Sequence, residues 1–203
     1  MRMFHWLFAL SFTGAYLTAE SEHWRVLHVT LGYILAGLLV FRLLYGLLGP
    51  RQSRLSALWN RLRVAPDWLR SVARAPSLSA IPWRPGQNLV MTLALVCMLA
   101  LVLPLTLSGY ATFNEWDLFL GEEVFEELHE FFGNLFLLVV LAHLGLLAGL
   151  SVLRRNNLAL PMLTGRLPGP GPSPVQKNRT WLAALLLAAV LAFAVASVLD
   201  LGA

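Results

Sequence analysis

Residues 127–143 read ELHEFFGNLFLLVVLAH, one of the most apolar runs of the chain. Its two histidines, His129 and His143, lie 14 residues apart. In an α-helix of 3.6 residues per turn, this spacing advances the chain by roughly 21 Å and returns it to within about 40° of the starting direction. Both imidazoles are therefore expected on nearly the same face of one helix, at two depths of a bilayer core that is about 30 Å thick.

The composition is that of an integral membrane protein. Of the 203 residues, 58% are hydrophobic and 13% are charged, and the mean hydropathy is +0.67, whereas soluble domains carry about 25% charged residues. The single cysteine, Cys97, excludes an internal disulfide, a cysteine-only metal site and a Cys-x-x-Cys-His haem attachment. A net charge of +4 does not indicate nucleic-acid binding, because the basic residues lie between the apolar runs, where membrane topology explains them.

The order of apolar runs predicts an all-α integral membrane protein with five transmembrane helices. The first four spans are expected at about 2–19, 25–48, 88–108 and 124–153, within residues 1–166. Residues 51–87 mix arginines with tryptophans, so this cytoplasmic loop is expected to lie partly on the membrane surface as an amphipathic helix. A Pro- and Gly-rich linker over 167–179 leads to the extra helix in 180–203.

The first span has an alternative interpretation as a signal peptide. Residues 15–19 resemble a small-residue cleavage site after a short hydrophobic region. His5 and Trp6 interrupt the usual leucine-rich pattern of such peptides, which favours a span.

The distribution of charge predicts the orientation. Loops rich in Lys and Arg stay in the cytoplasm, and five spans with a cytoplasmic N-terminus place all of the 15 Lys and Arg residues except Arg25 on that side. The C-terminus is then periplasmic. The same topology places all of the 11 Asp and Glu residues except Asp67 outside.

The topology gives each histidine of the opening stretch a partner at the same depth. His28 pairs with His129 near the outer surface, and His5 pairs with His143 further in. Two imidazoles suit haem iron, which needs two axial ligands, better than zinc, whose tetrahedral shell they leave incomplete. An intramembrane histidine can also bond a neighbouring helix or relay protons. His23 is left over, as a solvated or propionate-contacting residue.

Four further residues fit two stacked haems. Gly32 and Gly133 each follow an outer histidine by four residues, and a flat macrocycle against the helix needs that clearance. Packing of helices through small residues is the alternative explanation. Arg42 at the cytoplasmic end of its span could pair with propionates of the inner haem, and Arg25 with those of the outer haem, although either could be an interfacial anchor.

Several motifs resemble those of the bacterial cytochrome b561 and nickel-iron hydrogenase b-type cytochrome family, over roughly residues 3–166. The resemblance rests on the following segments: Met3-Phe4-His5-Trp6, His28 to Tyr33, Phe41 to Gly46, Gly49-Pro50-Arg51, Leu128-His129-Glu130 with His143, Arg155 to Leu158, and Met162 to Arg166. The resemblance implies a bacterial inner-membrane protein with a four-helix di-haem b core and axial ligands at His5, His28, His129 and His143. It also implies exchange of electrons between a quinone, ubiquinone or menaquinone, and a partner. The extra C-terminal span, which lacks histidine, departs from the family pattern.

The function expected from these features is electron transfer through two non-covalent haem b groups between the quinone pool and a periplasmic redox partner, such as a c-type cytochrome. The acidic outer surface would steer a basic carrier, although a merely solvated polar edge explains it too. One alternative is a superoxide:quinone oxidoreductase of the same fold. The acidic surface argues against it, because it would repel the superoxide anion. Another is the b-type cytochrome subunit of a hydrogenase-like complex. Membrane lipid is a certain partner, nucleic acid is not expected, and a homo-oligomer is left open.

Overall fold

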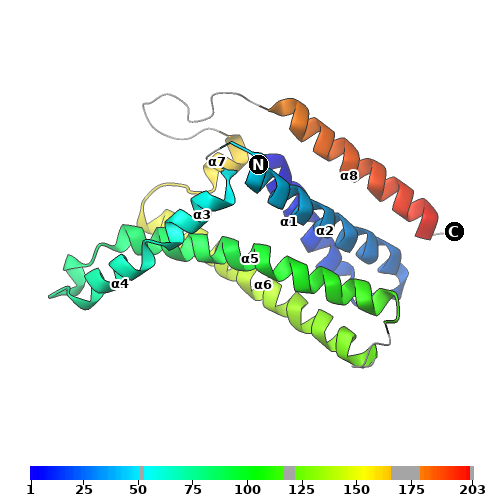
Figure 1. Ribbon diagram of the computed structural model, residues 1–203, viewed down its shortest axis with the longest axis horizontal. Coiled ribbons are helices and arrows are strands. Elements are labelled where there is room, and N and C mark those ends of the chain that lie inside the picture. Colours follow the sequence, from blue (N-terminus) through cyan, green and yellow to red (C-terminus); the bar gives the residue numbers. More distant parts are fainter. Residues whose placement is uncertain (51–52, 117–121, 166–178, 202–203) are drawn as a thin grey trace. The chain divides into compact units, whose positions relative to one another are not determined.

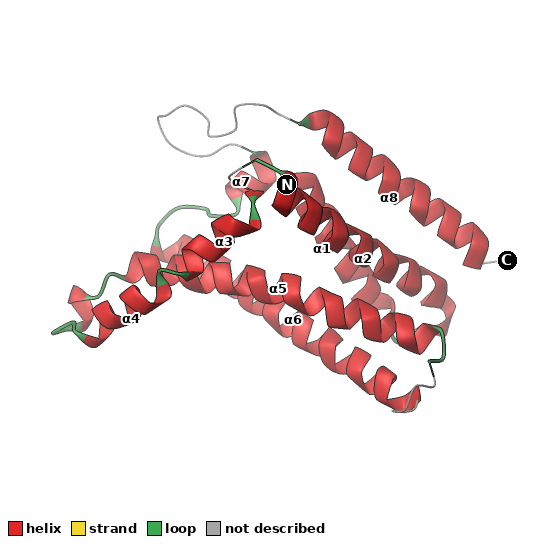
Figure 2. Ribbon diagram, viewed as in Figure 1, coloured by secondary structure: helices red, strands yellow, loops and turns green. Residues whose placement is uncertain are grey.

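The chain forms a helical protein in the computed structural model, which describes residues 1–203 except 51–52, 117–121, 166–178 and 202–203 (Figure 1). No strand occurs within these described ranges (Figure 2). In order, the helices are α1 (Arg2–Thr18), α2 (Arg25–Leu48), α3 (Leu55–Leu62), α4 (Ala65–Ala73), α5 (Trp83–Phe113), α6 (Glu122–Leu153), α7 (Leu160–Thr164) and α8 (Thr180–Leu201), with short 3-10 turns η1 (Glu22–Trp24) and η3 (Leu78–Ala80).

Within the described residues, four helices are long and apolar enough to cross a membrane: 22–48, 83–113, 123–153 and 180–200. This confirms the predicted all-α membrane class. Helix α1 has 17 residues, which at 1.5 Å per residue places it at the lower limit of about 17–25 residues for a span. Its crossing of the membrane stays a prediction.

Helix α5 extends beyond the predicted span 88–108 at both ends. The sequence Trp83-Arg84-Pro85-Gly86 by itself suggests a loop, because Pro and Gly usually interrupt helices. Pro85 stands in the first turn, however, where its missing N–H would have no intrahelical partner anyway. Gly86 leaves room for an indole ring, since a Cβ there would lie within 3.0 Å of three ring atoms of Trp68.

The helices divide into two compact units. The first unit comprises residues 1–42, 102–134 and 160–203, and therefore holds α1, α7, α8 and one part each of α2, α5 and α6. Its helices pack through aromatic pairs, with the rings of Phe4 and Phe41 6.2 Å apart between α1 and α2. Tyr33 on α2 contacts Tyr110 on α5 at 6.2 Å. Buried in this unit are Phe12, Ala15, Ile34, Leu35, Leu38, Leu39, Val102, Leu105 and Ala111.

Helix α8 packs against α1 in the first unit. One of its aromatic side chains, Phe193, meets the ring of Tyr33 edge-on at 6.5 Å. Most of its other large side chains are exposed, including Trp181 and Val195, as expected for a helix whose solvent is lipid. The predicted linker 167–179 lies outside the described residues except for Arg179, as do the loop residues Arg51, Asp117, Arg166 and Lys177.

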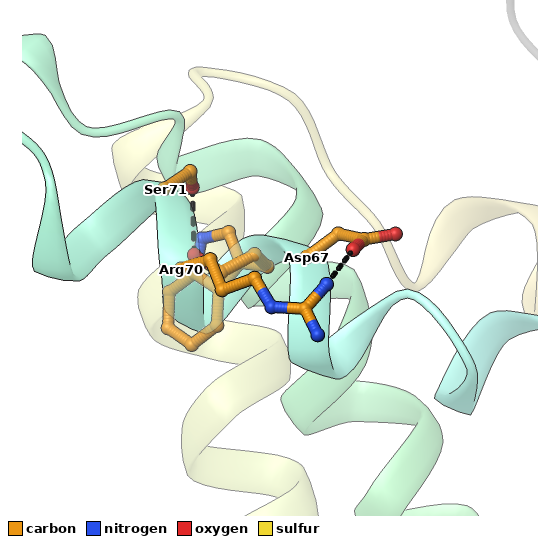
Figure 3. A network of polar contacts seen from close by, with 4 residues as sticks. Asp67, Arg70 and Ser71 are labelled. Carbon is orange, nitrogen blue, oxygen red and sulfur yellow. Dashed lines mark hydrogen bonds and ion pairs between the residues drawn. The ribbon is translucent and has the colours of Figure 1, made fainter.

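The second unit comprises residues 43–101 and 135–159. The predicted amphipathic surface helix of the 51–87 loop is here two short helices, α3 and α4. On α4, Arg70 donates to the carboxylate of Asp67 at 3.0 Å, and the Ser71 hydroxyl donates to the Trp68 carbonyl (Figure 3). The Trp68 indole N–H donates to the carbonyl of Pro82 at 3.0 Å, which ties α4 to the start of α5.

Candidate functional site

The first unit brings together two of the predicted site histidines. The rings of His28 on α2 and His129 on α6 have centroids 5.9 Å apart, and their planes lie at 86° to each other. Both side chains are half-buried. The pairing predicted from depth along the helices therefore has a counterpart in the packing of α2 against α6.

Each of these histidines is held by a backbone carbonyl of a third helix. The Nδ1 atom of His28 lies 2.8 Å from the carbonyl oxygen of Ala15 on α1. A carbonyl can only accept, so Nδ1 carries the hydrogen and Nε2 keeps its lone pair. Ala15 lies in the last turn of α1, and its carbonyl also accepts from the Thr18 hydroxyl at 3.1 Å. The end of α1 thus supplies an acceptor that the histidine uses.

His129 uses the same device on α5. Its Nδ1 atom lies 3.0 Å from the carbonyl oxygen of Leu105, and the Ser108 hydroxyl oxygen is further away at 3.4 Å. Ser108 itself donates to the same carbonyl at 3.1 Å. Nδ1–H of His129 therefore points to Leu105, which again leaves the Nε2 lone pair available.

Gly109 makes this approach possible. A Cβ at position 109 would lie 2.7 Å from Cε1 and 2.9 Å from Nδ1 of His129, well inside the separation of about 3.5–4.0 Å that carbon atoms prefer. The absence of a side chain at Gly109 therefore lets the imidazole approach α5 and reach the carbonyl of Leu105, one turn earlier.

The arrangement fits a haem bound between α2 and α6. Metal-ligating histidines usually donate their second ring N–H to a backbone carbonyl or carboxylate, and both histidines here do so. A metal–nitrogen distance of about 2 Å gives two imidazoles on opposite sides of one ion a separation of roughly 6 Å between ring centres, close to the observed 5.9 Å. Two axial nitrogens are what haem iron requires.

Open space adjoins this pair where the sequence predicted clearance for a macrocycle. A Cβ at Gly32 would meet no atom within 4 Å, and a Cβ at Gly133 would meet only Leu105 Cδ1, at 3.9 Å. Each glycine lies one turn along its helix from the histidine, on the same face. Neither glycine position is filled by a neighbouring side chain at closer than van der Waals contact.

The two arginines predicted to contact propionates differ in their surroundings. Arg25 is exposed at the start of α2, and its guanidinium lies over the ring of Phe113 at 5.9 Å. Arg42 is half-buried on the same helix, 14 residues after His28. Both roles toward propionates stay predictions.

The other predicted pair is divided between the units. His5 is half-buried in α1, in the first unit, with its ring edge-on to Trp6 at 5.8 Å. His143 is half-buried in the part of α6 that belongs to the second unit. The pairing of His5 with His143 therefore stays a prediction. His23 is exposed in η1, with its ring edge-on to Trp24 at 4.9 Å.

Sequence reasoning missed the residues that orient the outer histidines: Ala15, Leu105 and Gly109. No side-chain pattern identifies a carbonyl acceptor, because every residue has one. Gly109 had a signal, since Ser108-Gly109 forms a polar and small pair at the end of an apolar run. Only the register between α5 and α6 shows that His129 lies over it.

Comparisons with known proteins identify the family of the chain. A family model described as prokaryotic cytochrome b561 matches residues 1–165, most of the chain. Searches among curated proteins and among solved structures gave no match.

Proposed function

The chain belongs to the prokaryotic cytochrome b561 family, and from this premise we propose that it carries electrons through two bis-histidine haems, between the quinone pool and a periplasmic redox partner. The family makes the protein a bacterial membrane b-type cytochrome that binds haem b and takes part in electron transfer. Haem b, when bound, supplies reversible one-electron iron chemistry. The number of haems, their ligands and the partners are the content of the proposal.

The outer haem is assigned to His28 and His129. The observation that carries this assignment is that both Nδ1 atoms donate to backbone carbonyls, at 2.8 and 3.0 Å. Such bonds fix the plane of each ring before the group binds and place the hydrogen of the neutral imidazole on Nδ1, which leaves each Nε2 to coordinate. Gly32 and Gly133 leave the space beside the ligands open, and Arg25 would meet the propionates of this haem.

The inner haem is assigned to His5 and His143. His5 comes from the first turns of α1 and His143 from the second half of α6, and Arg42 would meet the propionates. The support for this pair is the depth of each residue along its helix and the family match, which includes both histidines. Two haems at two depths would allow electrons to cross the apolar layer in short steps.

The partner side is assigned from charge. With the N-terminus in the cytoplasm, the start of α6 faces the periplasm. There, Glu123, Glu126, Glu127 and Glu130 are exposed at helical spacing and form one acidic stripe. Such a stripe favours encounter with a basic carrier such as a c-type cytochrome. The quinone, ubiquinone or menaquinone, would exchange electrons with the same haem chain.

Four single alanine variants of the axial ligands test this assignment. His28→Ala and His129→Ala should each lose the outer haem and keep the inner one, because a haem with one axial histidine is weakly held. His5→Ala and His143→Ala should each lose the inner haem alone. The measurement is the haem content of the purified proteins, and a redox titration distinguishes the two haems.

His23→Ala is the matched control and should retain both haems. If His28→Ala and His143→Ala removed the same haem, the pairing would be wrong. If all four variants kept the full haem content, the histidines would not be the ligands.

A further inference from the structure

Arg2 contacts the end of α7, and the function proposed for the histidines does not use this contact. The guanidinium of Arg2, at the start of α1, binds the end of α7 across 160 residues of sequence. Its Nε donates to the carbonyl of Met162 at 3.1 Å, and its Nη2 donates to the carbonyl of Leu163 at 2.6 Å. Carbonyls in the last turn of a helix lack intrahelical partners and attract cations, so Arg2 caps α7.

Gly165 completes this contact. Its φ of +75° is a left-handed conformation that side chains rarely adopt, and it ends α7. A Cβ at this position would also collide with Nη1 of Arg2. Any other residue at position 165 would therefore change the end of α7 and displace the guanidinium. Arg2 and Gly165 lie at opposite ends of the residues 1–165 that the family model matches.

The turn that Arg2 belongs to has few interactions within its own helix. Helix α1 begins without a side-chain cap at Met1 and without an acidic residue in its first turn. Its first backbone bond runs from the N–H of His5 to the carbonyl of Met1, at 2.9 Å. Contacts with other helices therefore hold this turn: Phe4 packs against Phe41 on α2, and Arg2 binds the end of α7. His5 lies three residues after Arg2, on the same side of this turn.

We propose that Arg2 and Gly165 form a clamp that positions His5 as an axial ligand of the inner haem. The proposal rests on the function proposed above, because it needs His5 to bind haem. Arg2 touches no reacting atom and acts through His5, so it is a positioning residue. The clamp holds the first turn of α1 against α7, and His5 then meets the haem without first having to order that turn.

The test uses full-length protein purified from the membrane, with the variants Arg2→Gln, Arg2→Lys and Gly165→Ala. Arg2→Gln and Gly165→Ala should each lose at least half of the inner haem and keep the outer haem. Amide hydrogen exchange over residues 2–9, measured on protein stripped of haem, should rise about tenfold or more in both. Arg2→Lys keeps the charge but not the paired donors, so it should lose less haem than Arg2→Gln.

Two control variants separate the clamp from charge loss and from glycine loss. Arg61→Gln removes an exposed arginine, and Gly37→Ala adds a methyl group where no atom lies within 4 Å. Both should keep the two haems and the exchange rates of the parent protein. Since Gly165→Ala keeps the Arg2 charge, agreement between it and Arg2→Gln excludes an effect of membrane insertion.

Unchanged haem content and exchange in Arg2→Gln and Gly165→Ala would overturn the clamp. Faster exchange with both haems retained would show a contact that does not position His5, and would also overturn it. His5→Ala serves as the reference: if it loses one haem while the clamp variants lose none, the clamp alone fails. If His5→Ala keeps both haems, the assignment of the inner haem fails and the role of the clamp fails with it.

Discussion

At the scale of single residues, the outer pair depends on backbone atoms of helices other than those that carry the ligands. His28 donates to Ala15 on α1, and His129 donates to Leu105 on α5. Hydrogen bonds of this kind fix the tautomer and the plane of an imidazole before a metal binds. The planes of the two rings lie at 86° to each other. Four helices thus contribute to a site with two histidine side chains.

Gly109→Ala is expected to weaken the binding of the outer haem, because it disturbs the hydrogen bond that orients His129. The new methyl group would lie 2.7 Å from Cε1 of His129 and would force the ring away from the Leu105 carbonyl. Purified protein should lose at least half of the outer haem and keep the inner one, as measured by haem content and redox titration. Gly145→Ala is the control, because no atom lies within 4 Å of that position. A Gly109→Ala variant that kept the full content of the outer haem, at an unchanged midpoint potential, would contradict the account.

The sequence could predict that His28 and His129 lie together but not which atoms orient them. Histidine is rare within apolar spans, so His28 and His129 stood out, and the direction of successive helices gave their depths. Gly32 and Gly133 were predicted from the four-residue spacing; a Cβ would meet no atom within 4 Å at Gly32 and only Leu105 Cδ1 at Gly133, and their role beside a haem stays a prediction. Ala15 and Leu105 could not be found, because their side chains take no part and the identity of the acceptor depends on how the helices pack.

At the scale of secondary structure elements, the helices were predictable wherever hydrophobicity decides them. The predicted limits 25–48 coincide with those of α2. Helix α5 was predicted too short, because its first turn contains Pro85, which a helix start tolerates. The surface loop contains two short helices, α3 and α4, where the sequence predicted one amphipathic helix. The break near Arg63 was not predicted.

The acidic stripe of α6 predicts a salt-dependent reaction with a basic electron carrier. Its members Glu123, Glu126, Glu127 and Glu130 are exposed, and charges at this surface act over a Debye length of about 10 Å at 0.1 M salt. Stopped-flow measurement with a basic c-type cytochrome should show a rate that falls about tenfold or more as salt rises from low to high. Replacing the four glutamates by glutamine should lower the rate at low salt and remove most of the salt dependence.

A control for that measurement replaces Glu20 and Glu22, which lie in the turn before α2, by glutamine. The rate should change less than it does for the α6 variant, because two charges are removed instead of four and neither belongs to the stripe. A reaction of the parent protein that is indifferent to salt would leave the stripe without a docking role.

At the scale of the whole molecule, the family match and the helices divide the chain at the same place. The match ends at residue 165, at the end of α7, and α8 begins at Thr180. Helix α8 contacts α1 and meets Tyr33 through Phe193, but it supplies no histidine and no acceptor to the outer pair. The additional helix was predicted from its apolar run, and no motif in the sequence indicated what it does.

Deletion of residues 180–203 is therefore expected to leave both haems in place. Helix α8 packs through apolar side chains, whose neighbours lipid can cover instead, and the bonds that hold His28 and His129 come from α1 and α5. Haem content per chain and the two midpoint potentials should match those of the full-length protein. Phe193→Ala should behave in the same way. Loss of a haem on deletion would make α8 part of the di-haem core.

The most direct test of the central claim is the number of haems in the purified full-length protein. Haem b and protein are quantified on the same sample, by the pyridine haemochrome spectrum and by amino-acid analysis. Two bis-histidine sites predict two haem b groups per chain, both low-spin in the oxidised state. A ratio of one haem per chain would contradict the account by leaving a single site, and the absence of a b-type spectrum would contradict it entirely.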